Sequence, residues 1–137
     1  MLRRDYIQRM IEEYARVIAH ALGLKQQGRE EDARQELRNG WSVYFNEDPE
    51  LIAVLAPSQL LKRLLEHHNL TLAQIEIFAE GLRTEGDLYV NLNGAFAKDR
   101  YIKALALYEY VEMQDTSSFS IPRRNAIEEL RHCIPAL

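Results

Sequence analysis

The chain has 137 residues, of which 28% are charged and 47% hydrophobic, and its formal net charge is −4. This length accommodates one core of about five to seven helices, so we expect a single all-helical domain, 1–137. The acidic balance argues against a general affinity for nucleic acid or for an anionic membrane. The single cysteine, Cys133, excludes an internal disulfide, and no secretory signal pattern opens the chain, so we expect a cytoplasmic protein without nucleic-acid or membrane partners.

The first predicted helix begins at Asp5, with Gln8 completing a capping pair, and runs to about Gln27. Its apolar surface is wide and consists of two adjoining seams. One seam contains Ile7, Ile11, Tyr14 and Ile18, and the other contains Met10, Tyr14, Val17, Ala21 and Leu24. One seam suffices to dock a helix on a core, so two seams require cover from two sides. Either other helices of the chain cover both seams, or a second copy covers the first seam and forms a homodimer.

A second helix is predicted from Glu30 to Tyr44, after Gly28 ends the first one with a left-handed residue. Its inward positions are Ala33, Leu37, Trp41 and Tyr44 or Phe45. Its outer face alternates in charge, as in a solvated helix surface. Gly40 lies in the interior of this helix, where it predicts a close crossing with a neighbouring helix.

The middle of the chain predicts three further helices from their start signals. A cap and proline open a short helix over Asp48–Leu55, and Pro57 opens another that runs to about His68. Thr71 and Gln74 form a capping box, which starts a helix that continues to about Asn91.

The last third of the chain predicts two more helices separated by polar segments. After a break at Asn91–Gly94, a helix is expected over Asp99–Met113. The polar segment Gln114–Ser120 predicts a surface loop, and the final helix begins near Pro122 and ends before Pro135. Because no segment alternates with period two, the sequence predicts an all-α fold of six to seven helices.

Two helical-hairpin signatures recur along the chain. The first consists of Ala21, Leu24, Gly28, Ala33 and Leu37; the second consists of Leu82, Gly86 and Tyr89, followed by Tyr101, Ala104 and Tyr108. Their spacing resembles the tetratricopeptide repeat, with an insertion at Asn93–Asp99 in the second turn, and covers about two-thirds of the chain. The resemblance implies a short stack of antiparallel helical hairpins.

The opening segment Met-Leu-Arg-Arg-Asp-Tyr-Ile-x-Arg-Met-Ile-Glu, with the Gly-Arg-x-Glu-x-Ala hairpin, carries a second resemblance. It is similar to a family of small bacterial proteins of unknown function. That similarity implies no activity.

The tetratricopeptide resemblance implies a groove, lined by the first helix of each pair, that binds peptides or partner proteins. The corresponding positions here are Ala15, Ile18, Leu22 and Lys25 in the first unit, and Glu80, Arg83, Thr84, Asp87 and Tyr89 in the second. Family members that bind a terminal carboxylate use lysine and asparagine, where this chain has Ile18 and Leu22. Alternatively, the last helix of the chain fills the groove.

The remaining candidate groups do not form a recognisable catalytic or metal-binding motif. His67 and His68 diverge by about 100° on a helix and lack a third ligand at helical spacing. His20 is expected to be hydrogen-bonded and half-buried, and Cys133 to pack as a small residue.

We therefore expect no catalytic residues, metal or cofactor, and a protein-interaction or self-association module. The first alternative is a small-ligand or peptide site near Arg83, Asp87 and Tyr89. The second is an enzyme of unrecognised type, which needs two titratable groups converging in one pocket.

Overall fold

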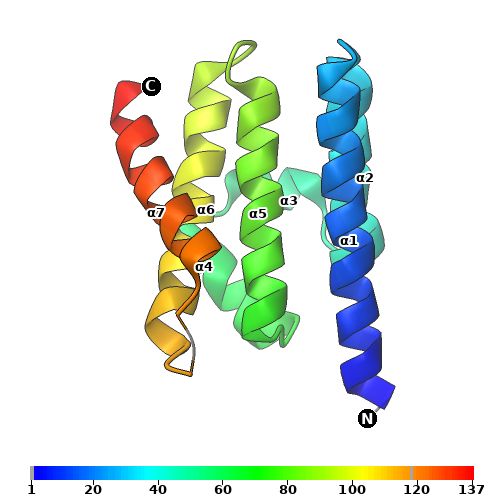
Figure 1. The fold of residues 1–137 in the computed structure, drawn as a ribbon, viewed down its shortest axis with the longest axis vertical. Coiled ribbons are helices and arrows are strands. Elements are labelled where there is room, and N and C mark those ends of the chain that lie inside the picture. Colours follow the sequence, from blue (N-terminus) through cyan, green and yellow to red (C-terminus); the bar gives the residue numbers. More distant parts are fainter. Residues whose placement is uncertain (1, 118) are drawn as a thin grey trace. The chain divides into compact units, whose positions relative to one another are not determined.

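The computed structural model describes residues 2–117 and 119–137, and these residues form seven α-helices and no strand (Figure 1). The helices are α1 (Leu2–Gln26), α2 (Glu30–Phe45), α3 (Pro49–Val54), α4 (Pro57–Lys62), α5 (Leu72–Tyr89), α6 (Gly94–Gln114) and α7 (Ile121–Cys133). A π-helical turn, Arg63–His67, follows α4, and a 3₁₀ turn, Ile134–Ala136, follows α7. The predicted all-α fold of six to seven helices is confirmed. Two compact units divide the chain between Leu55 and Ala56, and each is described separately below.

The first unit is built on an antiparallel hairpin of α1 and α2 (Figure 1). Gly28 adopts φ 78° in the turn, as predicted for the left-handed end of α1. The ring of Tyr14 packs on α2, with centroids 5.6 Å from Trp41 and 5.0 Å from Phe45. The predicted close crossing at Gly40 is confirmed, because a Cβ there would lie 2.9 Å from the Tyr14 ring.

The start of α1 differs from the prediction, whereas the start of α3 agrees with it. The helix begins at Leu2 instead of Asp5, and the Gln8 side chain donates to Glu12 at 3.1 Å. Local i,i+4 pairing therefore replaces the expected capping pair. At α3, the Asp48 carboxylate accepts from the Glu50 backbone N–H at 2.9 Å, as a helix cap does.

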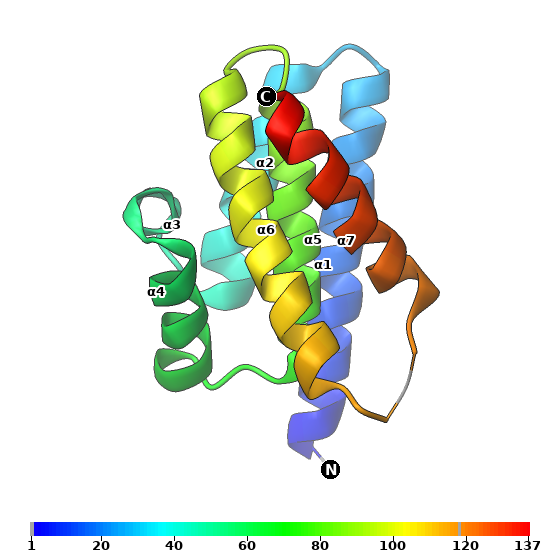
Figure 2. The same cartoon turned by 90° about the vertical axis from the view of Figure 1, so that its left-hand side faces the viewer.

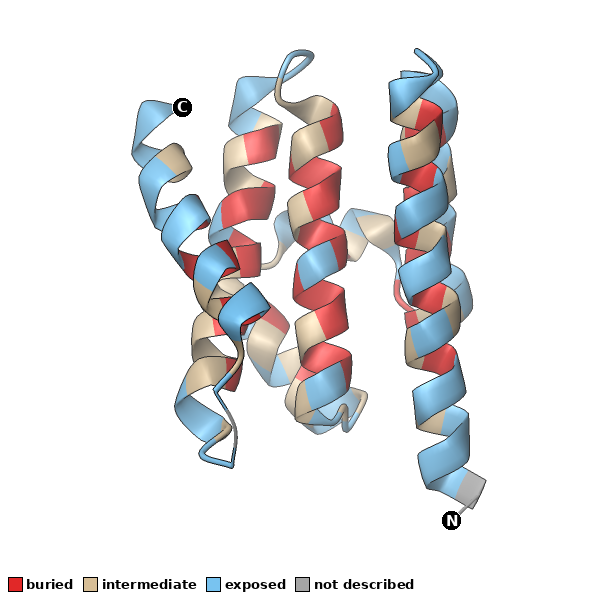
Figure 3. Cartoon of the chain, viewed as in Figure 1, coloured by how far each residue is buried: buried red, intermediate tan, exposed pale blue. Residues whose placement is uncertain are grey.

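The second unit begins with α4, which packs beside α6 (Figure 2). Pro57 opens α4 as predicted, and the helix widens into a π turn before Asn69, which has φ 50°. The Thr71 capping box is confirmed: Thr71 Oγ1 accepts from the Gln74 N–H at 3.2 Å, and Gln74 Oε1 accepts from the Thr71 N–H at 2.9 Å. Buried positions recur along the length of α5 (Figure 3).

The antiparallel pair α5–α6 corrects the predicted insertion. The prediction placed Asn93–Asp99 in an enlarged turn, but α6 starts at Gly94 and includes most of this segment. The Asn93 side chain accepts from the Phe96 N–H at 3.1 Å, so Asn93 caps a helix that starts at Gly94, five residues before the predicted start at Asp99.

The last helix, α7, packs against α6 and extends into a short 3₁₀ turn (Figure 2). It starts where Ser120 accepts from the Arg123 N–H at 3.2 Å, close to the predicted start at Pro122. Its inward residues Ala126, Ile127 and Leu130 are buried. The loop predicted before it includes Ser118, which lies outside the described residues.

Candidate functional site

The groove residues predicted in α1 do not form an open site. Ile18 is 3% exposed and belongs to the core, so it cannot line an open groove. Leu22 is exposed and Lys25 is half-buried, and neither lines the α1–α2 groove described below. Tyr14, from the predicted dimer seam, is fully buried against α2, while Ile7 and Ile11 are half-buried. The predicted dimer seam therefore needs correction, because Tyr14 already packs on residues of its own chain.

The groove residues predicted in α5 separate into two places. Glu80 and Arg83 line a cavity of about 180 Å³ between α5, α6 and α7. Asp87 instead accepts from the Tyr101 hydroxyl at 2.5 Å, and Tyr89 lies 4.2 Å from Phe96 between ring centroids. Other lining residues of the cavity are Glu76, Tyr108, Pro122, Arg123 and Ala126. The last helix thus covers the face of α5 on which the groove was predicted.

Arg123 of α7 is the most highly connected charged residue of this cavity. Its side chain is 3% exposed, and it donates to Glu112 at 2.8 Å and to Glu76 at 2.9 Å. Asp115 lies 3.5 Å from the same guanidinium. Burial disfavours the charged form, but the hydrogen bonds to Glu112 and Glu76 outweigh it and raise the pKa of Arg123. Arg123 therefore ties α7 to both α5 and α6.

Arg83, Glu80 and Tyr108 complete the cavity. Arg83 pairs with Glu129 of α7, and this bond helps to raise the pKa of Arg83 despite partial burial. Glu80 is exposed overall, but partial desolvation of its carboxylate at the cavity wall and the neighbouring Glu76 carboxylate raise its pKa, with Arg83 opposing the shift. Burial and the charge of Glu80 raise the pKa of the Tyr108 hydroxyl, which therefore stays protonated at neutral pH. These interactions hold helices together and account for the charged lining of the cavity.

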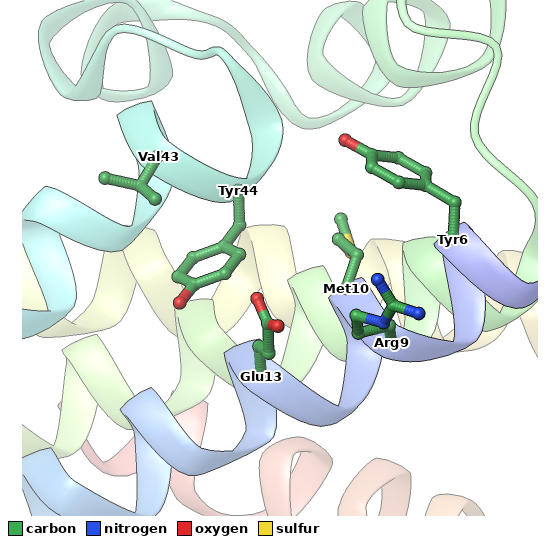
Figure 4. Close-up of a pocket in the computed structure, with 6 residues that line it drawn as sticks. All are labelled: Tyr6, Arg9, Met10, Glu13, Val43 and Tyr44. Atoms are coloured by element: carbon green, nitrogen blue, oxygen red, sulfur yellow. The ribbon is translucent and has the colours of Figure 1, made fainter.

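A second hollow surface lies between α1 and α2 in the first unit, and sequence analysis did not identify it. Two adjoining hollows, of about 360 and 270 Å³, share Glu13 and Tyr44 and together form what we name the α1–α2 groove. Its lining residues are Tyr6, Arg9, Met10, Glu13, Arg16, Val17, His20, Glu36, Val43 and Tyr44. Figure 4 shows Tyr6 and Tyr44 on opposite sides of Met10 in the larger hollow. Each residue from α1 lies three or four positions from others in this set, which places all of them along one helix face.

The α1–α2 groove combines exposed apolar side chains with charged ones. Tyr6 is 68% exposed and Val43 is 71% exposed, whereas Met10 is 7% exposed at the floor of the hollow. At one end, His20 Nδ1 lies 3.2 Å from Glu36. His20 is itself exposed, contrary to the predicted half-buried position. The apolar periodicity of α1 does not indicate this face as a groove, because charged residues such as Arg9, Glu13 and Arg16 occupy much of it.

Other candidate groups remain separate from these two surfaces. The rings of His67 and His68 lie edge to face, 4.8 Å apart. Cys133 is half-buried, its Sγ lies 3.7 Å from the Leu130 carbonyl, and burial raises the pKa of its thiol. Among the residues that the structure describes, no three His, Cys, Asp or Glu side chains lie close enough to hold a metal ion. None of the helices described here has the length and apolar character needed to cross a bilayer.

Comparisons with protein families, with curated proteins and with solved structures give no match for this chain.

Proposed function

We propose that this protein is a helical protein-interaction module whose binding surface is the α1–α2 groove. The observation that carries the proposal is the continuity of two hollows with Tyr6 and Val43 exposed along their walls. Tyrosine, methionine and arginine are enriched at protein interfaces, and all three line the larger hollow. A groove bounded by two helices fits a helix or an extended segment of another protein.

The helical hairpins support a tetratricopeptide-like assignment for this module. Both α1–α2 and α5–α6 are antiparallel pairs in which a glycine lies against a tyrosine of the neighbouring helix. Gly40 approaches Tyr14, and Gly86 approaches Tyr101. Proteins built from such hairpins offer extended surfaces to partners rather than enclosed reaction sites.

The proposal includes no catalytic activity and no cofactor, and it places the protein in the cytoplasm. Three of the four charged residues in the α5–α7 cavity, Glu76, Arg83 and Arg123, form ion pairs between helices. The raised pKa values of Arg83 and Arg123 therefore have a structural explanation. The lone Cys133 is compatible with a reducing compartment.

Site-specific photo-crosslinking in cells that make the protein tests this proposal. A photoreactive residue at Val43, in the groove, is compared with one at Val54, which is 76% exposed at the end of α3 and outside the groove. We expect a discrete protein adduct from position 43 and none from position 54. Equal adducts from both positions, or no adduct from position 43, would contradict the proposal.

The second candidate function is binding of a small ligand in the α5–α7 cavity. Glu80 carries this alternative, because its carboxylate lines the cavity and burial raises its pKa. The volume of about 180 Å³ limits the ligand to a small molecule, since sites for drug-sized ligands are about 300–1,000 Å³. A thermal-shift screen with small amines tests it: stabilisation of the wild type but not of Glu80→Gln would favour the alternative.

A further inference from the structure

Four side chains of α1 share the groove face and carry a specific order of charge. Tyr6, Arg9, Glu13 and Arg16 follow at spacings of three, four and three residues, so they form one stripe along the helix. Within the described part of the chain, Arg9, Glu13 and Arg16 form no ion pair. A partner helix with the complementary order of charge would pair with this stripe and cover the exposed ring of Tyr6.

We propose that the α1–α2 groove binds α1 of a second copy of this chain, with the two helices antiparallel and related by a two-fold axis. This inference rests on the proposed function and names its partner. In a two-fold contact, if residue i of one copy meets residue j of the other, then j also meets i. With the axis at the level of Ile11, Arg9 faces the position of Glu13, and Tyr6 faces the position of Arg16.

The chemistry of these facing positions is complementary in both directions. Arg9 and Glu13 form an oppositely charged pair that occurs twice across the axis. Arg16 meets the ring of Tyr6, an arrangement suited to a cation–π contact, and this also occurs twice. One antiparallel arrangement thus satisfies all four side chains of the stripe.

Neighbouring arrangements of the two helices bring like charges together. An axis at the level of Arg9 places the two copies of Arg9 against each other, and an axis at the level of Glu13 does the same for Glu13. Parallel helices in register produce both of these contacts. Like charges that meet across an interface are unfavourable, so the charge order disfavours these alternatives, and the axis near Ile11 also places Arg16 against Tyr6.

Affinity comes from the apolar part of the groove rather than from its charges. Exposed ion pairs contribute little to association. Tyr6 and Val43 retain most of their surface in the single chain, and Met10 and Tyr44 lie beside them. The partner helix would cover this surface, while Arg9, Glu13 and Arg16 set its direction.

Charge reversal measured by sedimentation equilibrium tests the arrangement. Arg9→Glu and Glu13→Arg each place like charges opposite one another, so we expect self-association of each single variant to weaken by about tenfold or more. In an equimolar mixture of the two variants, each supplies the charge that the other lacks. We therefore expect the mixture to dimerise with the wild-type affinity, although each variant alone associates about tenfold or more weakly.

Arg4→Glu is the matched control, because Arg4 is exposed on α1 and lies outside the groove. It should leave self-association unchanged, and far-UV circular dichroism should show equal helix content in all variants. A wild type that stays monomeric, or a mixture that fails to dimerise, overturns this inference. If the wild type is monomeric but Val43 still crosslinks to a different protein, the interaction module stands and only the identity of its partner is wrong.

Discussion

Gly86→Ala offers the sharpest test of the packing between α5 and α6. A Cβ at position 86 would lie 2.5 Å from Cε1 and 2.7 Å from Cδ1 of Tyr101. Tyr101 is only 6% exposed, and its hydroxyl donates to Asp87 at 2.5 Å. The ring is therefore held at both its edge and its hydroxyl, and it cannot turn away without breaking that bond.

The expected magnitude follows from three opposing contributions. Replacing a helical glycine by alanine stabilises a helix by about 1 kcal/mol. Inserting a methyl group into a packed contact costs about 1–3 kcal/mol, and loss of the Tyr101–Asp87 hydrogen bond costs about 1.5 kcal/mol or more because the acceptor is a carboxylate. The balance is a decrease of about 2 kcal/mol in the free energy of unfolding.

Urea unfolding followed by far-UV circular dichroism measures this decrease, and the chain supplies a matched control. Gly23 also lies inside a helix, but a Cβ there has no atom within 4 Å. Gly23→Ala should therefore stabilise the protein by about 0.5–1 kcal/mol. In a Tyr101→Ala background, Gly86→Ala should no longer destabilise, because the colliding ring is gone.

Equal stabilisation by Gly86→Ala and Gly23→Ala would refute the reasoning. The reasoning would also be refuted if Gly86→Ala were equally destabilising in the Tyr101→Ala background, since the destabilisation would then not come from the ring.

Three further predictions concern α7, the cavity and the start of α5. Arg123→Met should lower the free energy of unfolding, measured by urea titration, by about 2–3 kcal/mol. This is less than the cost of breaking a fully buried ion pair, because the partner carboxylates of Arg123 keep some contact with solvent. Arg124 is half-exposed, so Arg124→Met should change the free energy of unfolding by less than about 1 kcal/mol in the same titration. The pKa of Glu80 is raised above 4.5 in the folded state, so the free energy of unfolding falls as pH rises from 4.5 to the raised pKa. Glu80→Gln should therefore raise the thermal midpoint at neutral pH and flatten its decline above pH 4.5. An unchanged pH profile of the midpoint would contradict this. Thr71→Ala removes the acceptor for the Gln74 N–H and should cost about 1 kcal/mol in thermal or urea unfolding, with a neutral result counting against the cap.

Local signals in the sequence predicted much of the helical order. Asp48 and Thr71 mark helix starts through hydrogen bonds to residues nearby in the chain. Pro49 and Pro57 mark them through a fixed φ and a missing N–H, so neither signal needs tertiary information. The missed start of α6 also has a local cause: Asn93 is a strong cap, but Asn91–Gly94 together resemble a turn.

The candidate site was harder to predict because its charges act between helices. Arg123 lies near the start of α7, but its two carboxylate partners, Glu76 and Glu112, come from two other helices. Sequence spacing along one helix contains no information about which helix faces it. Likewise, the spacing of Tyr6, Arg9, Glu13 and Arg16 is visible in the sequence. That these residues line a groove depends on α2, which packs beside them.

The pairing of α5 with α6 has a consequence for how these helices slide past each other. Buried Glu85 pairs with buried Arg100, and at the next residues along the two helices the Tyr101 ring packs so close to Gly86 that a Cβ there would collide with it. A slip of α6 by one turn would separate Glu85 from Arg100, which keeps Asp99 of its own helix, and would drive the Tyr101 ring against a side chain larger than glycine. The longitudinal register of the hairpin is therefore specified twice, once by charge and once by shape, and misaligned forms are penalised even where their apolar contacts are equally good.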